Sequence, residues 1–245
     1  MVRDEQIAYA EKNGIPVQQT SKSPYSYDEN MWANTGEGGE IENPELVPPL
    51  ENILKWANTP EQAPDESEQL KIGFENGEPV SLNGVNYDKK DLILLLNEIG
   101  GKHAVGVFHL IEDRVVGLKV RGVYENPEQL VSTREENELK GFMDQKWAYL
   151  LYGAKYFEPV MDNIRAFINE QNKKVTGTVT LKLYKGNCDV VALSSPYSLF
   201  DENLATFNKS AAFNQNASAG FIELWNLPQK TAYQLKKVAT NAVVQ

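Results

Sequence analysis

The side chains best suited to hold a ligand are Glu112 and Tyr124, which share one predicted strand hairpin. Within residues 106–127, apolar residues lead into the polar run Glu112, Asp113 and Arg114 and then resume. This pattern predicts strand, turn, strand. We expect Glu112 at the turn and Tyr124 at the end of the second strand, so the hairpin can hold both at one edge of a sheet. For these residue types alone, the commoner outcome is a solvated acid and a half-buried tyrosine.

The usual catalytic and metal-binding patterns are missing from the sequence. The adjacent acids Glu112 and Asp113 would point to opposite faces of a strand, which does not suit shared acid–base work. Two histidines, His103 and His109, are too few for the usual zinc clusters and give a serine nucleophile little choice of base. No GxGxxG, GxxxxGK[ST] or HExxH occurs. The glycine-rich run at 36–39 has no predicted strand before it and carries an acid that would repel phosphate. We predict no catalytic residue and no metal site.

Composition limits the partners of this chain. Its 245 residues are enough for one large or two smaller domains. A net charge of −10 argues against nucleic acid and anionic membranes as partners. The single cysteine, Cys188, excludes an intrachain disulfide framework and any multi-cysteine metal site. There is neither an apolar run of about 18 residues nor a signal-like start, so we expect a cytoplasmic protein.

Hydrophobic periodicity predicts an α+β fold, with an antiparallel or mixed sheet, flanking helices and a terminal helix. The predicted helices cover residues 4–13, 88–100, 133–154, 158–173 and 228–244. The predicted strands cover residues 15–17, 70–74, 79–82, 107–111, 115–124, 175–184 and 188–193. The last helix has few large apolar residues, and we expect it to dock on a partner. Gly117 is expected to mark a bulge or a close approach within the second strand of the hairpin.

Residues 21–66 differ from the rest of the chain because they combine six prolines with many acidic and polar residues. A long stretch without periodicity is usually functional or disordered. Four aromatic residues argue for order, since they recover large apolar area when they pack: Tyr25, Tyr27, Trp32 and Trp56. We expect an ordered, irregular excursion laid over a surface.

Several strings in this sequence occur in the same order as in a known family. They are KNGIPV, SPYSYDEN, EIENP, LNEIGGKHAVG, IEDRVVGLK, QKWAYLLY, VTGTVTLKLYKGN, SPYSLFDENLATF and AAFNQNASAGFI. On these strings, nearly the whole chain resembles the carboxy-terminal part of argininosuccinate synthase. The resemblance implies a remnant of the nucleotide-binding domain at residues 1–20. A citrulline-binding synthetase domain would follow at 21–227, and an oligomerisation helix at 228–245.

The resemblance also implies a reaction and a set of ligand contacts. The family uses ATP, with Mg, to adenylate the ureido oxygen of citrulline, and the amine of aspartate then displaces AMP. Citrulline contacts carry over to Ser26, Thr35, Glu112 and Tyr124. This set suits a zwitterion, which needs an acid for its ammonium and hydroxyl donors for its carboxylate or ureido group. Thr35 stands where the family has serine and keeps the hydroxyl. The family forms tetramers through its carboxy-terminal helices, which implies a homo-oligomer.

Other parts of the family pattern are absent or altered here. The SGGLDTS pyrophosphate loop has no counterpart, so we expect no ATP binding and no activity from this chain alone, unless a separate nucleotide-binding domain joins it. The family's Gly-Arg-Ile-Asp run is replaced by glycine, Val107, Phe108 and His109. Val120 replaces a serine, and the stretch after Tyr124 is shorter by roughly three helical turns.

Three functions therefore stay open at the level of sequence. The chain is the citrulline-binding part of a synthase that works when a nucleotide-binding half is supplied. Alternatively, it is a non-catalytic module that binds citrulline or assembles with copies of itself. In the third alternative it is a solvated relic with no ligand.

Overall fold

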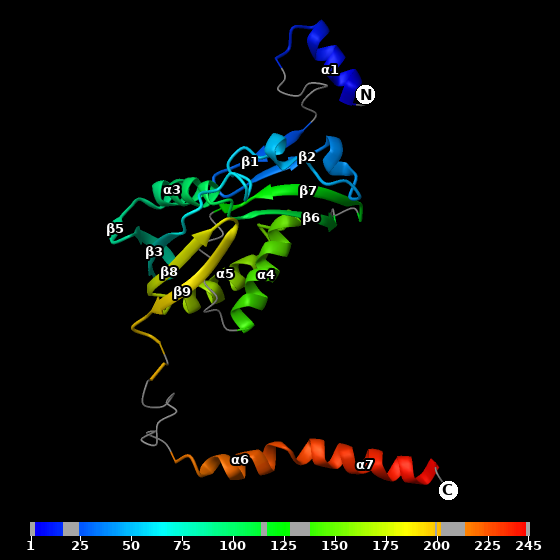
Figure 1. Ribbon diagram of the computed structural model, residues 1–245, viewed down its shortest axis with the longest axis vertical. Helices are drawn as coiled ribbons and strands as arrows, with labels where there is room; N and C mark the ends of the chain where they lie inside the picture. The colour runs from blue at the N-terminus through cyan, green and yellow to red at the C-terminus, as the bar shows by residue number, and fades with distance from the viewer. Residues whose placement is uncertain are drawn as a thin grey trace. The chain divides into compact units, whose positions relative to one another are not determined.

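The structure is a computed structural model that describes residues 3–16, 25–113, 117–127, 138–198, 200–201 and 214–243. The chain divides into two compact units, Met1–Tyr197 and Ser198–Gln245. The α+β prediction is confirmed, because the first unit contains two antiparallel sheets together with several helices (Figure 1).

The first sheet has four strands in the order β1-β2-β7-β6. Their bounds are β1 (Ser26–Glu29), β2 (Asn34–Glu37), β7 (Lys119–Glu125) and β6 (Val107–Asp113). The β6–β7 hairpin confirms the predicted pairing, but Glu112 does not lie at the turn. It lies within β6 opposite Val120, since the ladder continues to the pair Asp113 and Lys119. Gly117 precedes β7 with a φ of +82°, so it belongs to the turn and forms no bulge in the strand.

The excursion at residues 21–66 is more regular than predicted. Its described part contributes the β1–β2 hairpin, the short 3-10 helix η1 (Gly39–Glu42) and the short helix α2 (Leu50–Ile53). The strands were missed because they are only four residues long and mostly polar. The expectation that no strand accompanies the glycine-rich run is also wrong, because Gly36 and Glu37 lie in β2. The strand predicted at 15–17 is absent at Ile15 and Pro16, and Val17 lies outside the described residues.

One face of the first sheet is packed against this excursion. Its buried cluster consists of Tyr25, Ile41, Ile53 and Val123. Packing is close at Gly36, where an added Cβ would lie 3.1 Å from Cγ2 of Ile53. The excursion therefore covers one side of the sheet and leaves the other side free of this layer.

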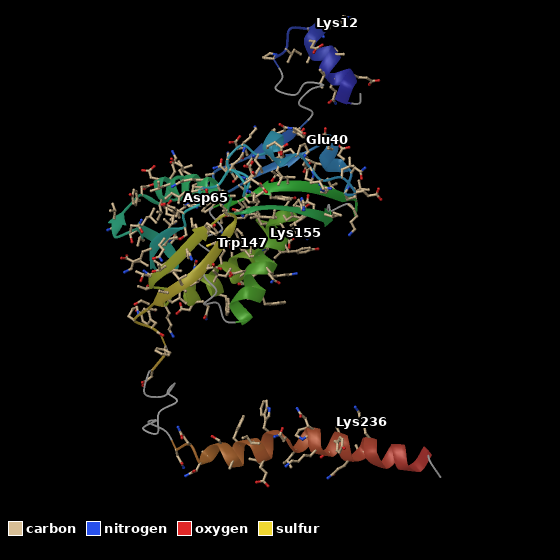
Figure 2. All side chains as sticks on the ribbon, viewed as in Figure 1. Lys12, Glu40, Asp65, Trp147, Lys155 and Lys236 are labelled. Atoms are coloured by element: carbon tan, nitrogen blue, oxygen red, sulfur yellow. The ribbon has the colours of Figure 1, made fainter. Side chains whose placement is uncertain are left out.

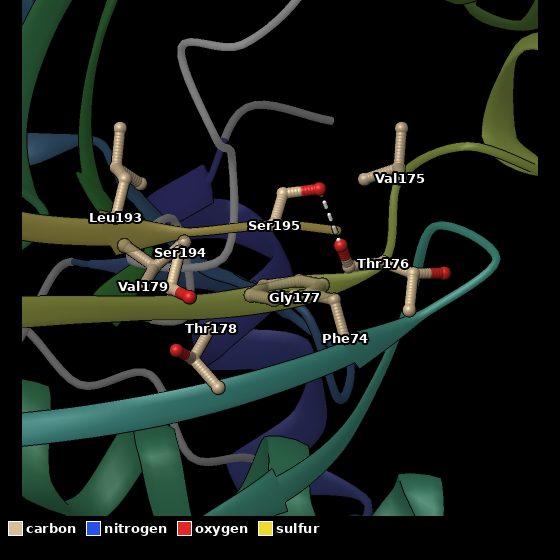
Figure 3. Close-up of a pocket in the computed structure, with 9 residues that line it drawn as sticks. All are labelled: Phe74, Val175, Thr176, Gly177, Thr178, Val179, Leu193, Ser194 and Ser195. Atoms are coloured by element: carbon tan, nitrogen blue, oxygen red, sulfur yellow. Dashed lines mark hydrogen bonds between the residues drawn. The ribbon is translucent and has the colours of Figure 1, made fainter. Parts of the chain in front are cut away.

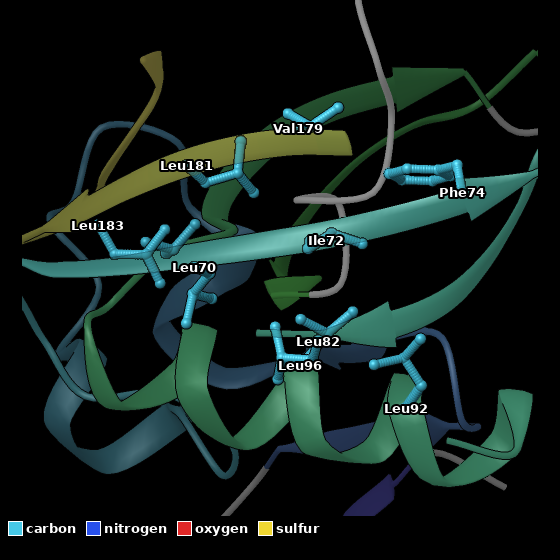
Figure 4. Close-up of a cluster of buried hydrophobic side chains, with 10 residues drawn as sticks. Leu70, Ile72, Phe74, Leu82, Leu92, Leu96, Val179, Leu181 and Leu183 are labelled. Carbon is cyan, nitrogen blue, oxygen red and sulfur yellow. The ribbon is translucent and has the colours of Figure 1, made fainter. Parts of the chain in front are cut away.

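The second sheet has five strands in the order β5-β4-β3-β8-β9. They are β5 (Val85–Asn86), β4 (Glu78–Leu82), β3 (Glu68–Glu75), β8 (Gly177–Tyr184) and β9 (Asn187–Ser194), which confirms the longer strands predicted here. Helix α3 (Lys89–Lys102) begins at the N-cap Asp88 and confirms the predicted helix. Figure 4 shows Leu92 and Leu96 of α3 beneath the inward-facing leucines of the strands, and these residues form the largest described apolar cluster.

Two further helices of the first unit pack on each other. Helices α4 (Glu138–Tyr152) and α5 (Pro159–Asn172) share a cluster of Leu150, Met161 and Ile164. They confirm the helices predicted at 133–154 and 158–173 for the described residues, while residues 133–137 lie outside that part. Helix α1 (Arg3–Lys12) confirms the predicted first helix.

The second unit contains helices α6 (Ala217–Trp225) and α7 (Leu227–Val243). Helix α7 confirms the predicted terminal helix, whereas α6 was not predicted. Figure 2 shows side chains projecting along both helices, Lys236 among them. Within the part of the chain that the structure describes, no helix is long and apolar enough to span a membrane.

Candidate functional site

The open face of the first sheet carries all four residues that the resemblance selects. In an antiparallel ladder, directly opposed residues point to the same face, and so does every second residue along a strand. Thr35 of β2 lies opposite Tyr124 of β7, and Tyr124 lies opposite Phe108 of β6. Glu112 follows Phe108 by four positions, so it shares this face. Ser26 lies two positions before Asp28, which is opposite Thr35, and therefore faces the same way.

Glu112 and Tyr124 are in direct contact. The Tyr124 hydroxyl donates a hydrogen bond of 2.7 Å to Oε2 of Glu112. Burial of the ring, this hydrogen bond and the negative charges of Glu112 and Glu37 raise the pKa of Tyr124 well above its ordinary value. Tyr124 is therefore a neutral donor at physiological pH. The predicted pairing of an acid and a phenol at one place on the sheet agrees with this geometry.

Ser26 and Thr35 lie on the two strands beyond Tyr124. Both are half-buried, and they occupy adjacent strands at the side of Tyr124 opposite to β6. The structure therefore places two hydroxyl groups on one side of the phenol and the carboxylate of Glu112 on the other. Ser26 and Glu112 are separated across the sheet by β2 and β7, so the four residues form a row rather than a tight cluster.

The charge of this face is negative. The described strand residues on it include the acids Asp28, Glu37 and Glu112, with no lysine or arginine among them. Such a surface suits an ammonium or another hydrogen-bond donor. A ligand that also carries a carboxylate would have only hydroxyl donors from these strands. The described face accordingly offers a carboxylate acceptor and hydroxyl groups, without a cation from these strands.

A buried acid links the other face of the first sheet to the excursion that packs against it. Glu125 is 2% exposed, and its carboxylate accepts hydrogen bonds from the backbone N–H groups of Lys55, Trp56 and Ala57 at 2.7–3.0 Å. The side-chain amide of Asn34 donates a further bond of 2.6 Å. Glu125 therefore connects β2, β7 and the excursion. It follows Tyr124 in the sequence and points to the opposite face of β7.

Two residues at the site were missed by sequence reasoning. The ring of Phe108 stacks on the ring of Tyr124 with a centroid distance of 5.3 Å and an interplanar angle of 9°. Gly122 lies under the same tyrosine, because an added Cβ would come within 3.0–3.1 Å of its ring end and hydroxyl. A glycine inside a predicted strand is a known sign of close approach. That signal was attributed to Gly117, which has nothing within 4 Å of an added Cβ.

The described hollows lie away from this row. One, of about 20 Å³, is close to the size of a single water. Figure 3 shows that Ser195, from the second Ser-Pro-Tyr-Ser string, donates a hydrogen bond to the Thr176 carbonyl beside it. A hollow of about 540 Å³ lies between the β1–β2 turn, Trp56 and α3. It contains none of the four selected residues. Within the described residues, no group of three or more metal-ligating side chains occurs.

By fold, the chain is an α+β domain built on two antiparallel sheets, one of which has a polar open face. Its sequence matches the family model described as Arginosuccinate synthase C-terminal domain over residues 25–232. The chain belongs to this family.

Individual relatives agree with this assignment. Argininosuccinate synthase of Carboxydothermus hydrogenoformans is 42% identical over 247 residues, which cover 96% of this chain and 61% of that protein. The enzyme of Pyrococcus furiosus is 44% identical, with coverage of 96% and 59%. That of Bacillus subtilis is 42% identical, with coverage of 96% and 61%. The chain thus spans about three fifths of the length of these relatives.

Proposed function

We propose that this chain is the citrulline-binding part of an argininosuccinate synthase, which joins citrulline and aspartate with the consumption of ATP. The observation that carries the proposal is the hydrogen-bonded pair of Glu112 and Tyr124 on the open face, in line with Thr35 and Ser26. Family membership supports the same reading. The protein would act in the cytoplasm in arginine biosynthesis.

Each of the four residues has a role that its chemistry supports. Glu112 accepts the ammonium group of citrulline, because a carboxylate forms strong charge-assisted bonds with it. Tyr124, held neutral by its surroundings, supplies a hydroxyl to the same ligand. Ser26 and Thr35 offer hydroxyl groups to the carboxylate or to the ureido group. None of these groups needs to gain or lose a proton in the reaction, so we assign them to binding.

ATP and aspartate would be held by other parts of the assembled enzyme. The chain spans about three fifths of its relatives, and its sequence has none of the usual phosphate-binding loops. The open face also offers no cation among its described strand residues to stabilise charge that develops during adenylation. A nucleotide-binding domain, with ATP and Mg, would complete the site, and this chain alone would not catalyse the ligation.

Citrulline titration by isothermal calorimetry tests the proposal directly. We expect the unaltered chain to release binding heat at millimolar citrulline, and Glu112→Gln to lose it because an amide cannot pair with an ammonium in the same way. The matched control is Glu75→Gln, an exposed acid at the end of β3 in the other sheet. Absence of heat with the unaltered chain, or equal heat with Glu112→Gln, would reject the assignment.

A complementation assay tests whether a separate nucleotide-binding domain is required for the reaction. The chain is mixed with a separately produced nucleotide-binding domain of a relative, and pyrophosphate release is measured with citrulline, aspartate and MgATP. We expect release only from the mixture. Release by this chain alone, or none from the mixture at saturating substrates, would contradict the proposed split.

A second candidate function, self-assembly, is favoured by the surface of α6 and α7. Large apolar side chains on these helices are 49–70% exposed: Phe221, Ile222, Leu224, Trp225, Leu227, Tyr233 and Leu235. Such a run on a soluble protein is a sign of an interface. The family resemblance suggests a homotetramer. Light scattering of the purified chain tests this, and a strict monomer at high concentration would count against it.

A further inference from the structure

We propose that Gly122 and Phe108 are positioning residues that hold the Tyr124 ring along β7, so that its hydroxyl reaches Glu112 before a ligand arrives. Neither residue would form a hydrogen bond or an ion pair with the ligand. The proposal rests on the proposed function for the identity of that ligand, citrulline, but the ring position can be tested without it.

The distances along the strands require a tilted ring. Glu112 lies opposite Val120, which is four residues before Tyr124 on β7. Four residues of an antiparallel strand span about 13 Å. A tyrosine that stood upright on the sheet would leave its hydroxyl far from Glu112. The observed 2.7 Å bond forms because the ring leans back along β7 toward Val120. It then lies over the residue of β7 midway between Val120 and Tyr124.

Gly122 is that position. An added Cβ would lie 3.0 Å from Cε2 and 3.1 Å from both Cζ and Oη of Tyr124, so the far end of the ring occupies the space of a side chain. The backbone of Gly122 is not in the left-handed region, and its neighbour pairs are regular. Alanine is therefore compatible with the strand itself. Its cost falls on the tyrosine ring, which has to lift away from β7.

Phe108 limits the ring from the side. It lies directly opposite Tyr124 on β6, and the two rings are nearly parallel at 5.3 Å. Thr35 occupies the corresponding position on β2. Tyr124 is thus bordered on both neighbouring strands and supported from below by a glycine.

This arrangement gives the site a preformed acceptor. A carboxylate that already accepts a hydrogen bond from Tyr124 has a fixed orientation, so a ligand loses less free energy in ordering it. If the ring is displaced, the groups that touch the ligand are unchanged but their geometry is lost. Affinity should then fall even though Glu112 and Tyr124 are both present.

The test follows the Tyr124 phenol by NMR in the whole chain labelled with ¹³C at Cζ of tyrosine, with Tyr124→Phe to assign its signal. We expect this signal to titrate well above the ordinary pH range of a tyrosine, because burial and the hydrogen bond to Glu112 raise the pKa of Tyr124. In Gly122→Ala and Phe108→Leu we expect the titration to move down by about one pH unit, and citrulline affinity to fall about tenfold. Gly220→Ala, in an open part of α6, and Ile111→Ala, on the opposite face of β6, are controls that should leave both values unchanged.

The outcomes separate this proposal from the proposed function. An unchanged Tyr124 titration in both folded variants, as judged by circular dichroism and melting temperature, would overturn the positioning role. If the titration moves as expected while the unaltered chain fails to bind citrulline, the positioning role is supported and the ligand assignment is rejected. Phe108→Leu keeps the proposal testable if Gly122→Ala does not fold, because it adds no atoms to the sheet.

Discussion

The two sheets of the first unit use different means to hold their strands in place. The five-stranded sheet packs over a cluster of apolar side chains, mostly aliphatic, that it shares with α3. The four-stranded sheet has a smaller apolar cluster and adds buried polar ties, with Glu125 and Asn34 on its packed face. Its Arg121 likewise donates to the carbonyl oxygens of Asn43 and Leu46.

The difference shows how a polar open face can be kept on a stable domain. Apolar burial is strong but not directional, whereas buried hydrogen bonds fix particular atoms. The five-stranded sheet relies mainly on its apolar core, with a polar contact between the buried His103 and Glu68 of β3. The four-stranded sheet must keep Thr35, Tyr124 and Glu112 in register on a face with little apolar cover. The polar ties behind that face supply this register.

The largest expected effect of a single change is on the aliphatic core. Leu96 is fully buried between α3 and the five-stranded sheet. We expect Leu96→Ala to lower the free energy of unfolding by about 3 kcal/mol, from lost burial and the cavity left behind. Urea unfolding followed by circular dichroism measures this. Leu94→Ala is the control on the same helix, because Leu94 is 45% exposed. Equal losses for the two variants would contradict the position of the core.

The next largest effect is expected at Glu125, whose buried carboxylate links the four-stranded sheet to the backbone of residues 55–57. Glu125→Gln replaces an acceptor of backbone N–H groups by an amide that must turn a donor toward some of them. We expect a loss of about 2–3 kcal/mol in the free energy of unfolding, since bonds to a charged group are lost and buried donors are left unpaired. Thermal and urea unfolding measure it, with the exposed Glu75→Gln as control. A loss below about 0.5 kcal/mol would mean that the tie does not hold this sheet together.

A smaller effect depends on pH. The Tyr25 hydroxyl donates a 2.9 Å bond to Oε2 of Glu40, and burial together with this acid raises the pKa of Tyr25 to about 12. Because the folded-state pKa lies above the unfolded one, the protonated phenol stabilises the fold below about pH 10, and this contribution is lost as the pH rises toward 12.

The difference in unfolding free energy between the unaltered chain and Tyr25→Phe isolates this contribution. We expect it to decrease by about 2 kcal/mol over that pH range. A difference that stays constant from neutral to strongly alkaline pH would show that the bond between Tyr25 and Glu40 does not form. Urea titrations at stepped pH values provide the measurement.

Sequence patterns predicted those parts of the fold that depend on local periodicity. Leu92 and Leu96 recur at helical spacing, and the alternation around β8 is regular, so α3 and the β8–β9 hairpin were predicted. The turns of the five-stranded sheet were also readable, because Asn76 and Gly77 adopt the positive φ that a two-residue hairpin favours. The β1–β2 hairpin could not be predicted from the sequence, because Tyr27 is the only apolar residue of β1.

The candidate site was only partly readable for a different reason. Glu112 and Tyr124 were selected from one hairpin, and their contact depends on local pairing. The role of Glu125 depends on backbone groups near Trp56, which lie 68–70 residues away in sequence. The role of Gly122 depends on the direction of the Tyr124 ring. Hydrophobic periodicity in the sequence predicts neither long-range contacts nor the direction of a side chain.

The smallest expected effect is at Thr35, for which the resemblance described above implies a serine in the family. Thr35→Ser keeps the hydroxyl and removes one half-buried methyl group, so we expect a loss of no more than about 0.5 kcal/mol in stability. Citrulline affinity should stay within about threefold. Thr35→Val is the matched variant, because it keeps the shape and β-branched character of the side chain but removes the hydroxyl.

The pair of variants separates packing from ligand contact at this position. If Thr35 serves the ligand, calorimetry should show that Thr35→Val weakens citrulline binding about tenfold while its stability stays close to that of the unaltered chain. If Thr35→Val binds as well as Thr35→Ser, the Thr35 hydroxyl has no part in binding. The row across the open face would then be interrupted at β2, and the buried hydrogen bonds behind β2 would need another explanation than the support of a ligand contact.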